Sequence, residues 1–196
     1  MVVSLFGHSV IADVDSVSKR LYDCLEKLIL QGANKFLVGA KGGFDNLAFE
    51  ILKNLKQKYD YICICVVLTT LSLLKKDEFG YSRADKYKCA QTYMYEIEDE
   101  HFKNRITTSN RFMVNDSQVV VCYVDKTAKY SGAKLSLKFA QKNGKQIINI
   151  FNDNELERTG NVQKMHVPNS DKLVPFYNLD VIISVGYRVK SKNGII

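Results

Sequence analysis

Short apolar runs alternate with amphipathic helical segments along most of this chain, and this alternation limits the folds that the chain can adopt. The most apolar run, residues 61–69 (YICICVVLT), has apolar side chains on both faces of a strand. Strands of that kind are typical of parallel sheets that helices cover on both sides. A helix between successive strands also supplies the long crossover that parallel pairing requires. We therefore predict an α/β fold with a doubly wound, mainly parallel sheet, helices on both faces and right-handed crossovers.

The spacing of apolar residues gives the expected order of elements. Strands are expected at residues 2–6, 35–39, 61–69, 92–98, 118–124 and 146–151. Helices are expected at residues 14–31, 46–58, 102–115 and 134–142, with a helical tract near 82–91. Asp13 or Asp15 can cap the first helix, and Gly32 and Asn143-Gly144 are natural helix ends.

Basic residues are concentrated in one segment of the chain. The net charge is +7, and residues 126–150 contain six lysines and no acidic residue. This segment is the natural place for an anionic partner. Lys134, Lys138 and Lys142 fall on one helical stripe, which is either a solvated outer face or a nucleic-acid or phosphate-rich surface. Few aromatic residues alternate with these lysines, which argues against nucleic acid.

The chain carries no sequence sign of a membrane segment. Its longest apolar run, residues 61–74, is shorter than the about 20 residues that a spanning helix needs. The N-terminus lacks the basic start of a signal peptide. We expect a cytoplasmic protein with no membrane partner.

Cysteine and acidic residues do not form a recognisable metal motif. The five cysteines include no C-x-x-C pair and no Cys/His cluster, so we expect reduced, buried thiols. The acidic run at residues 95–101 (YEIEDEH) lacks the spacing of a calcium loop and is interpreted as a solvated strand end. We expect neither a metal nor a cofactor, apart from a nucleotide bound as ligand.

Small and glycine residues gather where the expected strands end. Ligands of doubly wound sheets bind at the carboxyl ends of the strands. The candidate binding residues are therefore Gly7, His8 and Ser9 after the first strand, Gly39, Ala40, Lys41, Gly42, Gly43, Phe44 and Asp45 after the second, Asp125 after the fifth, and Ser131, Gly132 and Ala133 at the start of the last helix.

The stretch GAKGGFD, residues 39–45, has two interpretations. Free amides at the start of the following helix can hold a phosphate, and Gly42 and Gly43 let it approach closely. Alternatively, the glycines serve only a tight turn. Asp45 is expected to be the N-cap of the helix in preference to a catalyst. His8 either contacts the ligand or is a partly exposed rim residue, and no nucleophile is evident beside it.

Four motifs occur in an order that resembles the SLOG superfamily, in particular its YspA/YpsA-like branch. They are LFGHS, GAKGGFDNLAFE, NRFMVNDSQVVVCYVD and YSGAKLSLKFAQKNGKQIINI, and they cover residues 1–151. The resemblance implies a Rossmann-like domain that binds a nucleotide or nucleotide-derived small molecule. Members of the superfamily are often dimeric, so a homodimer is among the implied partners. Arg111 matches the arginine of the third motif and suits a phosphate, or else it forms a salt bridge to a neighbouring loop.

The chain also departs from the family pattern. Ser9 stands in place of an arginine, Ala40 in place of a glycine, and residues 131–133 read Ser-Gly-Ala instead of Gly-Gly-Thr. The Pro-Gly-Gly-x-Gly-Thr-x-x-Glu pattern of LOG-type phosphoribohydrolases is absent. We therefore expect a binding or sensor protein for a phosphate-bearing nucleotide-like molecule and assign no catalytic residue. The alternatives are a nucleotide-processing enzyme of LOG phosphoribohydrolase type and a DprA-like nucleic-acid-binding protein.

Residues 152–196 are expected to form a C-terminal extension. Within them, residues 176–194 (FYNLDVIISVGYRVKSKNG) resemble a fragment of RhuM-type virulence proteins. A fragment of this length cannot bury a core of its own, so we do not expect an independent domain. The resemblance suggests a truncated fusion from a mobile element.

Overall fold

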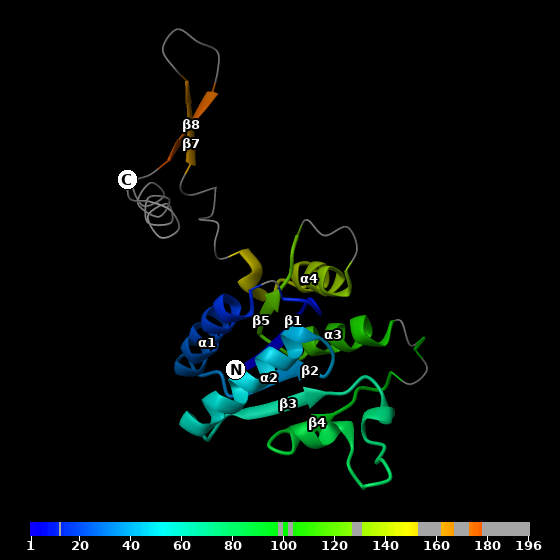
Figure 1. Cartoon of the computed structure of the whole chain (residues 1–196). Helices are drawn as coiled ribbons and strands as arrows, with labels where there is room; N and C mark the ends of the chain where they lie inside the picture. The colour runs from blue at the N-terminus through cyan, green and yellow to red at the C-terminus, as the bar shows by residue number, and fades with distance from the viewer. Residues whose placement is uncertain are drawn as a thin grey trace, which may run out of the picture. The chain divides into compact units, whose positions relative to one another are not determined.

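The computed structural model describes residues 1–11, 13–97, 100–101, 104–126, 131–152, 162–166 and 173–177 (Figure 1). Contacts within the chain divide it into two units, Met1–Phe151 and Asn152–Ile196, which are described separately. The second unit contains an antiparallel pair of strands, β7 (Val162–His166) and β8 (Leu173–Tyr177). The resemblance predicted for residues 176–194 lies, apart from the end of β8, outside the described residues.

The first unit is built on a six-stranded parallel sheet, and this confirms the predicted α/β, Rossmann-like fold. The strand order is β4-β3-β2-β1-β5-β6, and every neighbouring pair is parallel. The strands are β1 (Val2–Gly7), β2 (Lys35–Gly39), β3 (Cys63–Val67), β4 (Gln91–Tyr93), β5 (Val119–Tyr123) and β6 (Gln146–Asn149).

Four α-helices cover the two faces of the sheet: α1 (Val14–Leu30), α2 (Gly43–Lys58), α3 (Arg105–Asn115) and α4 (Gly132–Lys142) (Figure 1). Alternate residues of a strand point to opposite faces. On β1, Leu5 packs in the core that includes α1 and α2, whereas its neighbour Phe6 packs with α4. Both faces of the central strands are therefore buried, as the apolar run at residues 61–69 predicted.

The helix ends follow the predicted capping residues. The side chain of Asp13 accepts a hydrogen bond from the amide of Ser16, 3.1 Å away, so Asp13 is the N-cap of α1 and Asp15 lies in the first turn. Gly32 and Gly144 follow α1 and α4 with φ of 95° and 62°. These left-handed conformations suit glycine and end both helices.

The fourth strand is shorter than predicted, because β4 ends at Tyr93 and lies at the sheet edge. Beyond it the chain turns towards α3. The ring of Tyr95 stacks on Phe112, 5.0 Å between centroids, and its hydroxyl donates to the Asp116 carboxylate at 2.6 Å. The described residues also form the short 3-10 helices η1 (Leu71–Leu73), η2 (Arg83–Tyr87) and η3 (Ile150–Asn152).

None of the five cysteines forms a disulfide. The prediction that they are buried is confirmed for Cys65 and Cys122, but Cys24 and Cys63 are half-buried and Cys89 is exposed, so it is wrong for Cys89. No helix within the described ranges is long and apolar enough to cross a bilayer.

Candidate functional site

A cleft of about 440 Å³ lies at the carboxyl ends of β1 and β2 and beside the N-terminus of α4. The chain reverses its direction of travel across the sheet between β1 and β5, and such switch points are where doubly wound sheets bind ligands. We call this cleft the polar cleft. It is lined by Phe6, Gly7, His8, Ser9, Lys41, Asp45, Ile106, Thr107, Asn110, Ser131, Gly132 and Ala133. Eight of these were predicted from the sequence, and they come from three separate segments.

His8 joins the walls of the polar cleft to each other. Its Nε2 accepts a hydrogen bond from the amide of Asp125 at 2.7 Å, and its Nδ1 lies 3.2 Å from Ser131 Oγ. A ring nitrogen that accepts from an amide carries no proton, so the proton is on Nδ1 and is donated to Ser131. Both nitrogens are thus engaged within the protein. His8 positions the site and has no free nitrogen to act as a base.

The glycine turn is closed by the segment after β1. The amide of Gly43 donates to the Ser9 carbonyl at 2.8 Å, and that of Phe44 donates to the His8 carbonyl at 3.4 Å. These two amides and that of Gly42 were expected to hold a phosphate. The amides of Gly43 and Phe44 already have acceptors within the protein.

Two glycines are required by close packing between these segments. A Cβ on Gly7 would lie 2.6 Å from Cγ of Phe44, and one on Gly43 would lie 2.5 Å from the Ser9 carbonyl oxygen. Neither distance is compatible with a side chain, so the structural interpretation of the turn holds for Gly43. The ring of Phe44 is buried and stacks on Tyr123 with 5.8 Å between centroids.

Asp45 is a buried carboxyl group on the wall of the polar cleft. It is 8% exposed, and burial raises its pKa to about 7, although the amide of Lys41 and the charge of Lys86 oppose this rise. The N-cap of α2 is Gly42, so the predicted capping role of Asp45 is wrong. Its Oδ2 instead accepts from the amide of Lys41 at 3.1 Å, and the carboxyl group packs against Gly39.

The N-terminus of α4 offers backbone donors on the wall of the polar cleft. Ser131 is the N-cap, and its Oγ accepts from the amide of Lys134 at 3.4 Å. The first amides of a helix have no partner within the helix. Among the described residues, no acceptor is bonded to the amides of Gly132 and Ala133, and both residues line the cleft. An anion is favoured at this end by the helix dipole.

Helix α3 supplies a wall that the sequence prediction missed. Asn110 is 8% exposed, its Nδ2 donates to Ser136 Oγ at 3.1 Å, and it lines the cleft together with Ile106 and Thr107. The sequence did contain a signal for this wall of the cleft. Ile106, Asn110 and Met113 are spaced for one helix face, so an amide on that face was a buried polar residue in an otherwise apolar row.

Other predicted site residues lie elsewhere. Arg111 is exposed, and its guanidinium carbon lies 5.7 Å from the centre of the Phe139 ring on α4. Arg111 does not line the polar cleft, because the neighbouring Asn110 takes the inward position on α3. Asp125 contributes its backbone amide to His8 and is half-buried. Ala40 and Gly42 line a different cleft, beside α2.

In the lysine stripe of α4, Lys138 and Lys142 are exposed, whereas Lys134 is half-buried. Lys145, from the same basic segment, has a structural role. Its ammonium group donates to the carbonyls of Asn115 and Ser117 at 3.0 and 2.7 Å, at the end of α3. Residues 127–130 of this segment lie outside the described residues.

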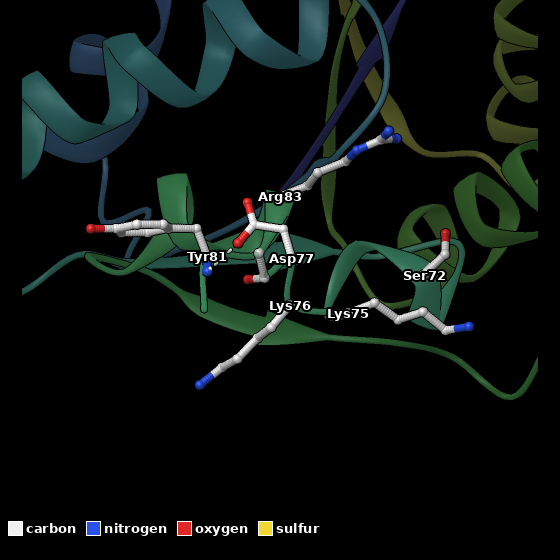
Figure 2. Close-up of a pocket in the computed structure, with 7 residues that line it drawn as sticks. Ser72, Lys75, Lys76, Asp77, Tyr81 and Arg83 are labelled. Atoms are coloured by element: carbon white, nitrogen blue, oxygen red, sulfur yellow. Dashed lines mark hydrogen bonds between the residues drawn. The ribbon is translucent and has the colours of Figure 1, made fainter. Parts of the chain in front are cut away.

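Figure 2 shows a third depression, of about 450 Å³, in the segment between β3 and β4. Its side chains do not converge, since Lys75 and Lys76 point in different directions. The Asp77 carboxylate accepts from the amides of Phe79 and Tyr81, both at 2.9 Å, and so closes a surface turn. This depression has no arrangement suited to a ligand.

Within the ranges that the structure covers, no group of three or more His, Cys, Asp or Glu side chains could hold a metal ion. Glu98 and Asp99 of the acidic run lie outside those ranges.

Comparison with known proteins connects the polar cleft to a family. A family model described as "YspA SLOG family" matches residues 6–154. The match includes every residue that lines the polar cleft. No curated protein matches the chain.

Proposed function

This chain belongs to the YspA SLOG family, and from that premise we propose that it binds a nucleotide or nucleotide-derived small molecule that carries phosphate. The ligand occupies the polar cleft. The observation that carries the proposal is the pair of amides at Gly132 and Ala133, which have no acceptor among the described residues and line a polar cleft at the switch point of the sheet.

The cleft divides into parts with different chemistry. The start of α4 presents amides and the positive end of a helix dipole, which suits a phosphate. The opposite walls carry Thr107, Asn110 and Asp45, which can bind hydroxyl groups or the polar edge of a base. A carboxyl group that is protonated donates as well as accepts, so Asp45 can serve either kind of partner below its pKa of about 7.

Binding is favoured over catalysis by the state of His8. Its two ring nitrogens are engaged with Asp125 and Ser131, so it neither activates a nucleophile nor takes a proton from water. The LOG-type Pro-Gly-Gly-x-Gly-Thr-x-x-Glu pattern is also missing.

The binding proposal is tested by identifying what the protein carries and then blocking the cleft. The purified protein is denatured and the released small molecules are identified by mass spectrometry, followed by calorimetric titration with nucleosides and nucleotides. Asn110→Asp places a negative charge in the cleft with little change of shape and should weaken nucleotide binding about tenfold or more. Asn115→Asp makes the same change on an exposed position of α3 and should leave the affinity unchanged.

Two results would overturn the proposal. One is a wild-type protein that carries no nucleotide and binds none in titration. The other is an equal affinity of the wild type, Asn110→Asp and Asn115→Asp, because binding would then occur away from the polar cleft.

A second candidate function is hydrolysis of a nucleotide glycosidic bond in the same cleft. It is favoured by Asp45, whose pKa of about 7 suits a group that takes a proton from water or gives one to the leaving base at neutral pH. The test is the release of free base from nucleoside monophosphates. Release that disappears in Asp45→Asn would establish the enzyme, and no release at a substrate concentration that saturates binding would exclude it.

A further inference from the structure

A second cleft, of about 580 Å³, lies beside the polar cleft on the other side of the turn after β2. Ala40, Lys41 and Gly42 form one wall, and residues from the segment after β3 form the other. Three of the lining side chains are cationic, Lys41, Arg83 and Lys86, and none of the lining side chains is acidic. We call it the basic cleft. Three positive charges without an acidic residue favour an anionic occupant.

The short helix η2 determines where two of these cations lie. Side chains three residues apart share a face of a 3-10 helix. Ala84 and Tyr87 are buried, whereas Arg83 and Lys86 are exposed on another face. The ring of Tyr87 packs edge-on against Phe49 of α2 with 4.8 Å between centroids. This contact anchors η2, so that both cations are presented at the rim from a packed element.

Lys86 is held in the basic cleft by neutral groups. The ammonium group of Lys86 donates to Asn46 Oδ1 at 2.9 Å and lies 4.6 Å from the centre of the Tyr87 ring. The ion pairs found among the described residues involve Lys53, Lys58 and Lys88, and none involves the three cations of the basic cleft.

Arg83 lines both this cleft and the depression of Figure 2. In Figure 2 its side chain points away from Lys75, Lys76 and Asp77. Thr69 and Thr70 line the same cleft, and the Thr70 hydroxyl donates to Ser72 Oγ at 3.1 Å. The guanidinium of Arg83 and the ammonium groups of Lys41 and Lys86 are the kinds of donor that recognise phosphate oxygens.

We propose that the basic cleft is a phosphate-binding subsite and that it takes a second phosphate group of the ligand whose remaining parts occupy the polar cleft. The link between the two clefts is Lys41, which lines both. The part of the inference that concerns a shared ligand rests on the proposed function. A ligand that occupies both clefts must carry separated phosphate groups, and this narrows the ligand class to nucleotide derivatives such as nucleoside bisphosphates and dinucleotides.

The test compares two double variants that remove equal charge. Arg83→Gln/Lys86→Gln removes two cations from the basic cleft, and Lys75→Gln/Lys76→Gln removes two exposed lysines outside it. Each protein is titrated at low salt with adenosine and guanosine, their 5′-monophosphates, their 3′,5′-bisphosphates and inorganic pyrophosphate. We expect the wild type and the lysine control to bind a bisphosphate about tenfold more tightly than the monophosphate. In the basic-cleft variant this ratio should fall to about one, with nucleoside affinity unchanged.

The outcomes separate the inference from the proposed function. If nucleotides bind but the basic-cleft variant keeps the wild-type ratio, the inference is overturned and the proposed function stands. If no nucleoside or nucleotide binds the wild type, the proposed function fails. Pyrophosphate binding that is lost only in the basic-cleft variant would then support a phosphate subsite but overturn the shared ligand. Circular dichroism of both variants checks that the removal of exposed charges leaves the fold intact.

Discussion

The amide of Asp125 donates a 2.7 Å hydrogen bond to Nε2 of His8, and the two residues are 117 positions apart in the sequence. The bond connects the end of β1 to the end of β5, and Nδ1 of the same ring reaches Ser131 at the start of α4. From the sequence, His8 was either a ligand contact or a rim residue; in the structure it connects three of the elements that form the polar cleft.

Removal of the His8 ring should destabilise the protein. His8→Ala leaves the Asp125 amide and the Ser131 hydroxyl without their partner, and we expect a loss of about 1–3 kcal/mol in the free energy of unfolding. Urea denaturation measures this loss, with the exposed neighbour Ser9→Ala as the control. Long-range ¹H–¹⁵N spectra should also find the ring proton on Nδ1. A proton on Nε2, or equal stabilities of the two variants, would contradict the assigned hydrogen bonds.

Asp45 should make stability depend on pH. Burial raises its pKa from 3.8 to about 7 in the folded protein, so the folded state holds the proton more tightly than the unfolded state. As pH rises from 4 to 7 the unfolded state loses its proton first, and the folded protein is destabilised by up to about 4 kcal/mol. Urea denaturation of the wild type and Asp45→Asn at pH 4.5 and pH 8 tests this. The variant should lack this decline, and parallel pH profiles would show that Asp45 is not its source.

Gly7 should not tolerate a methyl group. A Cβ at this position would lie 2.6 Å from the ring of Phe44, which is fully buried. We expect Gly7→Ala to lower the free energy of unfolding by about 1–3 kcal/mol through overpacking. At Gly132 the nearest atom to a new Cβ is Thr107 Oγ1 at 3.4 Å, so Gly132→Ala is the matched control and should change stability by less than about 0.5 kcal/mol. Equal melting temperatures for the two variants would refute the close contact.

Lys145 should contribute to stability, unlike the exposed lysines of α4. Its ammonium group donates to two carbonyls at the C-terminus of α3, those of Asn115 and Ser117. Lys145→Met keeps the apolar stem but removes these bonds and the favourable charge at the helix end, so we expect a loss of about 1–2 kcal/mol. Lys142→Met, on the exposed face, serves as the comparison. A similar small effect of both substitutions in thermal denaturation would assign Lys145 to the solvated surface.

The sequence by itself determined the fold and the edge of the sheet at which the polar cleft lies. The apolar run at residues 61–69 required cover on both faces, and the alternation with helices required parallel pairing, because these patterns are local consequences of burial. The signals for helix ends at Asp13, Gly32 and Gly144 were likewise local, and the structure has them where they were expected.

Only the tertiary structure decided which polar groups at that edge remain available. The carbonyls of His8 and Ser9 accept hydrogen bonds from the amides of Phe44 and Gly43, so these two amides are not available to a ligand. Arg83 and Lys86 join the basic cleft because Tyr87 anchors η2 on α2. Each of these pairings joins residues that are distant in sequence. Their partners depend on how strands and helices pack, and a hydrophobic pattern along the chain does not carry that information.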